Sequence, residues 1–242
     1  MAGERVRGPR ITADAVSVSF GRGAGRVLAV SGLTARFEPG ITGLVGPNGA
    51  GKSTFLRTLT GLLRPSEGAL LVDGLPPEAY VASQGVAFLP EAPPLPEFLT
   101  VAEFLSGIPG GDASWEAEDG DRLGLDGILS RMIGTLSLGQ KKKTALRAAL
   151  LSDPSLLVVD EPTNGLDPSA VRELRTLLVE LGEAGRTVIV SSHHLDELQR
   201  VAQSVLFVDR GRALGHWDRE AALARFGSFD TLYDHLFHGS AT

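Results

Sequence analysis

The sequence predicts an α/β fold: a mainly parallel sheet, an N-terminal antiparallel β subdomain and an inserted α-helical subdomain. Alternating apolar residues mark the first forty residues as half-buried strands. A proline-rich segment at 90–97, followed by a helical pattern, separates two lobes. From Ser155 onward, short apolar runs alternate with helical patterns, as in a parallel sheet covered by helices.

The N-terminal strands are predicted at residues 16–20 and 33–37, where every second residue is apolar. A turn at 38–40 leads into a short apolar strand at Ile41–Val45, which runs into a glycine-rich loop. After the loop, apolar residues recur at helical spacing as far as Leu63, and Pro65 is expected to end that helix.

The middle of the chain is predicted to be helical from Thr100 to Leu151, after a further strand at Leu70–Val72. Thr100 and Glu103 have the spacing of a capping box. Five acidic residues and no basic residue lie between 112 and 121, which is typical of a solvated loop or an exposed helix face.

The second half supplies three predicted parallel strands, at 156–159, 188–190 and 205–208. A helix should begin at Asp167, with Pro168 in its first position. We therefore expect one domain, 1–242. Its core is formed by 1–90 and 152–242, its helical subdomain by 91–151, and an amphipathic helical tail by 228–242.

Composition narrows the functional classes. The 242 residues are 43% hydrophobic, which suits one large core, and the formal net charge of −6 argues against a general nucleic-acid-binding surface. The absence of cysteine excludes disulfides, thiolate metal sites and cysteine nucleophiles. No apolar run approaches the roughly 18–20 residues that span a bilayer, so a membrane role is expected to come through a partner.

The glycine-rich loop matches G-x-x-x-x-G-K-[ST], the phosphate-binding loop of P-loop NTPases. Its glycines let backbone N–H groups converge on phosphate oxygens, and the following helix adds its positive dipole end. Lys52 is expected to reach the β- and γ-phosphates and Ser53 to ligate Mg²⁺. With only four lysines in the chain, a chance match is improbable. The predicted nucleotide-binding residues of this segment are Gly46, Pro47, Asn48, Gly49, Ala50, Gly51, Lys52, Ser53 and Thr54.

Two acids, Asp160 and Glu161, end the apolar strand that begins at Leu156. Acids at the carboxyl end of a central strand lie at the crevice where α/β sheets bind ligands. Asp160 is expected to hold Mg²⁺ through water and Glu161 to polarise the attacking water. The alternative is a solvated pair at a strand end, which the phosphate loop on the same chain makes less favourable.

Residues 136–140, Leu-Ser-Leu-Gly-Gln, resemble the LSGGQ signature of ATP-binding cassette (ABC) proteins, and the resemblance covers nearly the whole chain. Ser137 and Gln140 have capping-box spacing, so the signature should open a helix whose N–H groups point outward. In that family these groups meet ATP held by a second subunit, so dimerisation is required for hydrolysis. The implied signature residues are Ser137, Leu138, Gly139 and Gln140.

The same resemblance implies roles for other residues. His193, in Ser-Ser-His, resembles the switch histidine that contacts the γ-phosphate, and His194 is less favoured. Phe20 stands where the family stacks an aromatic ring on adenine, although a core strand residue is the alternative. Glu91 falls at the Mg²⁺-coordinating glutamine of the Q-loop. The D-loop is implied for Asn164, Gly165, Leu166 and Asp167.

The chain departs from the family pattern at two positions. Leu138 replaces a glycine and Glu91 replaces a glutamine, although a carboxylate also ligates Mg²⁺. Both variants resemble those in the ATPases of bacterial ABC-2-type exporters. Lys141–Lys143 are expected to form a solvated helix face rather than a nucleic-acid-binding patch.

The resemblance implies an ATP-hydrolysing subunit that uses ATP and Mg²⁺. It implies a homodimer, or a heterodimer with a second cassette, that powers a separately encoded integral membrane permease. The protein would be cytoplasmic, at the inner face of the cell membrane. A soluble cassette ATPase acting on ribosomes or DNA, and a nucleotide-binding regulator without turnover, are the alternatives.

Overall fold

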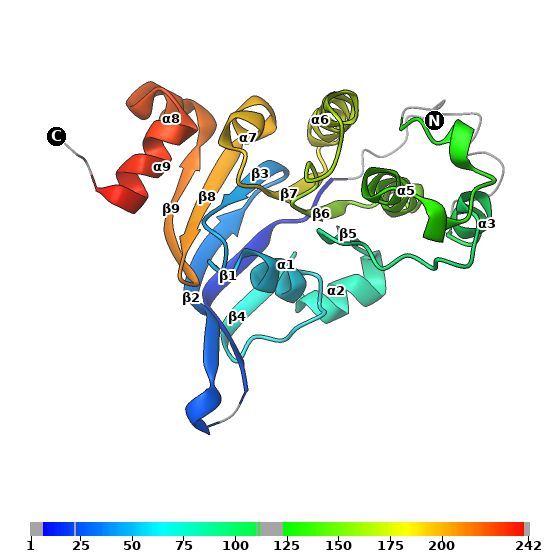
Figure 1. The fold of residues 1–242 in the computed structure, drawn as a ribbon. Helices are drawn as coiled ribbons and strands as arrows, with labels where there is room; N and C mark the ends of the chain where they lie inside the picture. The colour runs from blue at the N-terminus through cyan, green and yellow to red at the C-terminus, as the bar shows by residue number, and fades with distance from the viewer. Residues whose placement is uncertain (1–6, 22, 110, 112–122, 240–242) are drawn as a thin grey trace.

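A six-stranded sheet forms the centre of the fold (Figure 1). The computed structural model describes residues 7–21, 23–109, 111 and 123–239. Five strands are parallel, and the sixth, β9, pairs antiparallel with β8 at one edge. In spatial order the strands are β5 (Ala87–Leu89), β6 (Leu156–Asp160), β7 (Thr187–Ser191), β3 (Gly40–Val45), β8 (Ser204–Asp209) and β9 (Arg212–Asp218).

A second, antiparallel sheet confirms the predicted β subdomain. It has the order β2 (Val27–Phe37), β1 (Ile11–Phe20) and β4 (Glu67–Val72). With α1 (Lys52–Leu59), it buries one face of the six-stranded sheet, because both sheets and the helix contribute to one apolar cluster. The mixed α/β architecture with a mainly parallel sheet is therefore as predicted.

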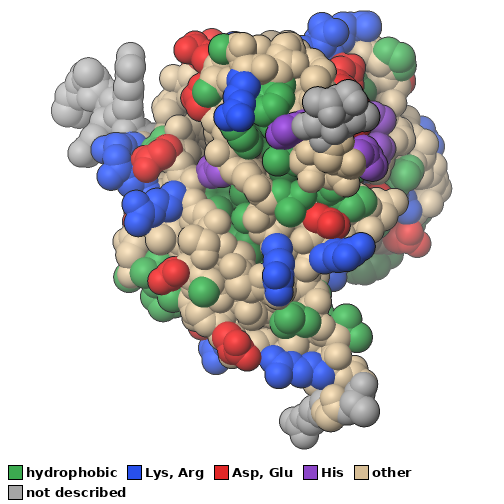
Figure 2. Space-filling model, turned by 90° about the vertical axis from the view of Figure 1, so that its left-hand side faces the viewer, with side chains coloured by type: hydrophobic (Ala, Val, Ile, Leu, Met, Phe, Trp, Pro, Cys, Tyr) green, Lys and Arg blue, Asp and Glu red, His purple; other side chains and the backbone are tan. Residues whose placement is uncertain are grey.

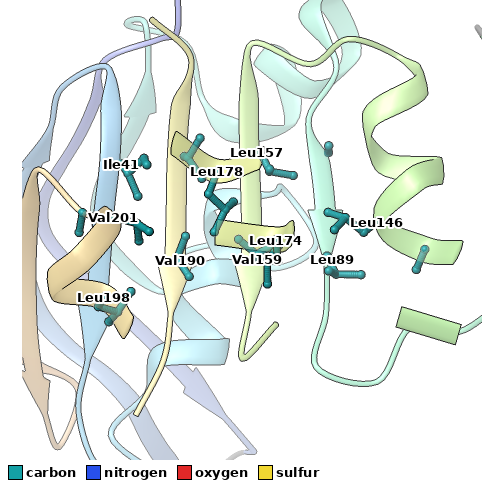
Figure 3. Packing of buried hydrophobic residues seen from close by; sticks show 14 of the residues in the cluster. Ile41, Leu89, Leu146, Leu157, Val159, Leu174, Leu178, Val190, Leu198 and Val201 are labelled. Carbon is teal, nitrogen blue, oxygen red and sulfur yellow. The ribbon is translucent and has the colours of Figure 1, made fainter. Parts of the chain in front are cut away.

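The opposite face of the large sheet is covered by α6 (Pro168–Glu183), α7 (Leu195–Val201) and α9 (Phe229–His238), with α8 (Arg219–Phe226) beside them. Leu174 and Leu178 of α6 lie over Val159 and Val190 of the sheet (Figure 3). Asp167 caps α6 with Pro168 in its first position, as predicted. The tail helix α9 packs on its own core, where the ring of Phe207 meets two rings of α9.

The segment from 100 to 151 is less helical than predicted. Among the described residues it contains α3 (Val101–Ser106), two 3₁₀ turns (Asp126–Ile128 and Ile133–Thr135) and α5 (Leu138–Leu151). The predicted capping box of Thr100 and Glu103 is present at α3. The acidic run lies at residues 112–121, outside the described residues.

Helix α1 is shorter than its apolar pattern predicts. It ends at Leu59, and Leu62 is 65% exposed. Gly61 takes a left-handed φ of 72°, where its missing side chain leaves room for the start of α2 (Pro77–Gln84). Within the described part of the chain, no helix is long and apolar enough to cross a membrane.

Candidate functional site

The glycine-rich loop joins β3 to α1, at the carboxyl edge of the sheet where the sequence placed it. A Cβ atom on Gly46 would clash with the carbonyl oxygen of Val208, and one on Gly51 with that of Ala29. Gly51 also has φ 99° and precedes α1 without a side-chain cap. Glycine is therefore required at both ends of the loop, and the first N–H groups of α1 face it uncapped.

Lys52 is the first residue of α1, and its ammonium group lies at the centre of the loop. The Nζ atom donates to the carbonyl oxygens of Gly46, at 2.7 Å, and Pro47, at 3.3 Å. It lies 3.9 Å from Oε1 of Glu161, and the Lys52 side chain is 7% exposed. The loop thus holds a nearly buried cation that faces the acid at the end of β6.

Glu161 is held by groups from the neighbouring strand. Its N–H donates to the hydroxyl of Ser191 on β7, at 3.0 Å, and Nδ1 of His193 lies 2.8 Å from its Oε2. Its backbone has φ 48°, a left-handed conformation that costs a non-glycine residue about 1–3 kcal/mol. Asp160, directly before it, is buried and accepts a hydrogen bond from the same serine hydroxyl.

A cavity of about 530 Å³ joins the phosphate loop to these acids. Within it, Nδ2 of Asn164 donates to Oε1 of Glu91, at 3.1 Å. The lining residues are Ala29, Asn48, Gly49, Ala50, Gly51, Lys52, Ser53, Thr54, Glu91, Glu161, Asn164 and His193. The structure therefore brings together residues from five separate predicted motifs. A larger cavity, of about 740 Å³ against the β subdomain, contains none of them.

Other predicted site residues lie outside this cavity. Asp160 lies behind it, and Phe20 does not line it. Phe20 is 44% exposed at the end of β1, so the alternative that it fills the core is wrong. Its ring is free to meet a ligand, but the structure does not bring it to the phosphate loop.

The signature residues begin α5 and also lie outside the cavity. Ser137 and Gln140 form the predicted capping box, with reciprocal hydrogen bonds of 3.1 and 3.3 Å. Leu138 is 53% exposed and lies against Gly165, whose missing side chain leaves the space that Leu138 occupies. The departure at Leu138 is therefore accommodated by the D-loop segment of the same chain.

The D-loop segment ends where Asp167 caps α6. Its carboxylate accepts hydrogen bonds from the N–H groups of Ala170 and Ser169, and these bonds, the first above all, lower the pKa of Asp167. The cap fixes the start of α6. Because Gly165 contacts Leu138, the D-loop segment lies directly between α6 and the signature helix.

The three consecutive lysines do not form the solvated face that the sequence predicts. Lys142 is 2% exposed, and its Nζ donates to the backbone carbonyl of Glu161, at 2.9 Å. Burial lowers the pKa of Lys142, against the opposing effect of Glu91, Glu161 and Asp160. The sequence did carry a signal, because Lys142 lies three and four residues before Ala145 and Leu146 on the buried face of α5.

The flanking lysines are only partly exposed, and both are paired. Lys141 donates to Glu97, at 2.7 Å, and Lys143 lies 3.9 Å from Glu173. On another face of the molecule, shown in Figure 2, basic and acidic side chains are interspersed as well. The lysine run therefore does not present three free cations in a row.

The residues predicted to hold Mg²⁺ fit that ion. The Ser53 hydroxyl and the Glu91 carboxylate both line the cavity, and Asp160 lies behind it, so the donors are all oxygen atoms. The described residues contain no cluster of three or more acidic, histidine or cysteine side chains that would hold a metal alone. This suits Mg²⁺, which takes one or two protein oxygens and completes its shell with phosphates and water.

Comparison with known proteins agrees with this geometry. The family model for ABC transporters matches residues 30–164. The lantibiotic transport ATP-binding protein SrtF of Streptococcus pyogenes is 32% identical over 177 residues, covering 72% of this chain and 77% of that protein. The uncharacterized ABC transporter ATP-binding protein YhcH of Bacillus subtilis is 35% identical over 184 residues, or 73% of this chain, which spans only 60% of YhcH.

Comparison with solved structures identifies the same family. A solved structure of an ATP-binding subunit of an ABC transporter superposes with a TM-score of 0.81 at 29% identity, covering 93% of this chain and 98% of that one. The family match spans the phosphate loop, the signature helix and the acidic strand end, and it contains all the residues that line the cavity except Ala29 and His193. The chain therefore belongs to the ABC transporter family, as an ATP-binding subunit.

Proposed function

We propose that this chain hydrolyses ATP for an exporter, in which ATP clamps two cassettes together and drives a separately encoded membrane permease at the inner face of the membrane. One observation carries the proposal: the carboxylate of Glu161 lies 3.9 Å from Lys52 in the cavity lined by the phosphate loop. Export is supported by the similarity to a lantibiotic transport protein and by the departures at Glu91 and Leu138.

The phosphate loop binds the nucleotide. Lys52 donates two of its three N–H groups to loop carbonyls, which leaves one for the β- and γ-phosphates. Phe20 stacks on the adenine. Ser53, Glu91 and Asp160 would hold Mg²⁺, directly or through water, and the bound ion would supply positive charge to the phosphate oxygens.

Glu161 acts as the general base. Its carboxylate accepts a proton from water as the water oxygen bonds to the γ-phosphorus and the bond to the bridging oxygen of ADP breaks, giving ADP and inorganic phosphate. His193 holds one carboxylate oxygen at 2.8 Å, which orients the other toward the cavity. Until nucleotide enters, Lys52 and Glu161 partly neutralise each other.

The signature helix completes the site of a second cassette. Ser137 caps α5 outside the cavity of its own chain, so its N–H groups face a phosphate held elsewhere. In a homodimer, or in a heterodimer with another cassette, the N–H groups at the start of each signature helix meet a phosphate held by the other subunit. This places each ATP between the phosphate loop of one subunit and the signature of the other.

Ser137→Arg tests the composite site. We expect nearly unchanged ATP binding by the monomer but loss of ATP-dependent dimerisation and of hydrolysis, because the arginine fills the γ-phosphate position. The measurements are ATP titration, size-exclusion chromatography with ATP, and phosphate release. Thr100→Arg is the matched control, because it removes the same kind of capping box from α3. Hydrolysis by Ser137→Arg at the wild-type rate would contradict the composite site.

Mixing Ser137→Arg with Lys52→Ala sharpens this test. In the mixed dimer one composite site carries both lesions, and the other has an intact lysine and an intact serine. We expect phosphate release to reappear when the two inactive proteins are mixed, provided that one site turns over alone. The control is Lys52→Ala alone, at the total protein concentration of the mixture.

Phe20→Ala tests the stacking role. We expect ATP and GTP to bind more weakly by a similar amount, about 1–3 kcal/mol, because stacking does not depend on the identity of the base. Phe98→Ala removes another exposed ring, in the segment before α3, and should leave both affinities unchanged. Unchanged nucleotide affinity in Phe20→Ala, measured by titration, would remove Phe20 from the site.

A further inference from the structure

The buried lysine of α5 joins the signature helix to the predicted base of the same chain. Lys142 lies in the second turn of α5, which Ser137 caps, and its side chain is almost completely buried. Its ammonium group donates to the backbone carbonyl oxygen of Glu161, at 2.9 Å. One helix therefore carries both the signature residues and a direct hydrogen bond to the residue that faces the phosphate loop.

The bonded carbonyl belongs to the one residue of the site whose backbone is strained. Glu161 has a left-handed φ of 48°, and the same torsions set the direction of its side chain. Ser191 holds its N–H on one side, and on the other its carbonyl accepts from Lys142 and, at 3.4 Å, from the N–H of Asn164. A strained conformation persists only where surrounding groups hold it.

The ammonium group of Lys142 is buried close to three carboxylates. Burial lowers the pKa of Lys142, and the carboxylates of Glu91, Glu161 and Asp160 oppose this effect. Its two neighbours in sequence do not share this role, because Lys141 and Lys143 pair with Glu97 and Glu173 instead. The function of Lys142 is thus separable from that of the other lysines.

We propose that Lys142 is a positioning residue for hydrolysis, which holds Glu161 in its left-handed conformation and so aims the carboxylate at the attacking water. This inference rests on the proposed role of Glu161 as the base. It follows that the base is aimed only when α5 is seated against the end of β6. Because Ser137 caps α5, contact between Ser137 and the nucleotide of the second cassette affects the position of the Glu161 carboxylate in this chain through one rigid helix.

Lys142→Met tests the proposal, because methionine keeps the length and the apolar stem but cannot donate. We expect kcat to fall roughly 10- to 100-fold, with little change in ATP affinity, since a small misplacement of a reacting group has an effect of that size. Lys142→Arg, which retains the charge and donors, should keep more of the activity. Lys141→Met and Lys143→Met are matched controls in the same helix and should keep the wild-type kcat.

A double variant separates positioning from a general structural effect. In the background of Glu161→Gln, Lys142→Met should lower residual turnover no further, because the group that it aims is already absent. A second loss of similar size, or a kcat of Lys142→Met equal to that of the wild type, would overturn the proposal. If Lys142→Met does not fold, Lys142→Leu gives the same test, because leucine is also apolar and cannot donate to the carbonyl of Glu161.

If the proposed function is wrong, the same variants give a different set of results. If Glu161→Gln alone hydrolyses ATP at the wild-type rate, the base assignment is wrong whatever Lys142 does. If Glu161→Gln is inactive while Lys142→Met has the wild-type kcat, the base assignment stands and the positioning role is wrong.

Discussion

Glu161→Gln should bind Mg·ATP as tightly as the wild type and lose most of its turnover. The amide has the shape of the carboxylate but cannot accept a proton from water, and a general base contributes roughly 10²- to 10⁴-fold to a rate, or about 3–5 kcal/mol. The backbone contacts of residue 161 with Ser191 and Lys142 do not involve the altered atoms. The variant should therefore accumulate as an ATP-dependent dimer.

Single-turnover phosphate release and size-exclusion chromatography with ATP measure the two effects. Glu97→Gln makes the same acid-to-amide change at an exposed residue that contacts Lys141, and should hydrolyse ATP normally. Wild-type turnover from Glu161→Gln would falsify its assignment as the base. Loss of ATP binding together with turnover would instead indicate that the substitution disturbs the loop.

Lys52→Ala should lose tight ATP binding, by roughly 100-fold, because hydrogen bonds to charged groups contribute about 1.5–3 kcal/mol each to binding of this kind. The substitution also removes the donor that the carbonyls of Gly46 and Pro47 share, so the loop loses its own internal restraint. ATP titration measures the affinity, and circular dichroism with thermal unfolding checks the fold.

Lys143→Ala is the matched control, since it removes a lysine that pairs with Glu173, away from the phosphate loop. It should bind ATP as the wild type does. Unchanged ATP affinity in Lys52→Ala, with the control behaving as expected, would remove the phosphate-loop assignment and with it the proposed mechanism.

The features that the sequence predicted well are those set by local chemistry. Two capping boxes and the Asp-Pro start of α6 appear as expected, because a cap depends on residues three or four apart. The loop glycines were predicted from the spacing of the phosphate-loop motif alone, although their close neighbours in space, Val208 and Ala29, lie far away in the sequence. Strands β6, β7 and β8 were equally clear, because strands covered on both faces are continuous apolar runs.

The features that were missed depend on distant partners. Strand β5 has three residues and forms only against β6, while β9 is an edge strand that carries Arg212, His216 and Asp218. Lys142 is the same residue type as its partly exposed neighbours, and only the end of β6 gives it a carbonyl to bind. No local pattern in the sequence indicates a partner nineteen residues away.

The strand that leads into the phosphate loop, β3, can pair with its two neighbours only after the ribosome has synthesised them. β3 lies between β7 and β8, where Gly40 pairs with Thr187 and Thr42 with Ser204. At about 5–20 residues per second, a ribosome needs on the order of ten seconds to add the chain between them. During that time the loop has emerged without the sheet that shapes it. Nucleotide therefore stabilises only the nearly finished chain, and a stalled nascent chain that ends before Thr187 should not be retained on immobilised ATP.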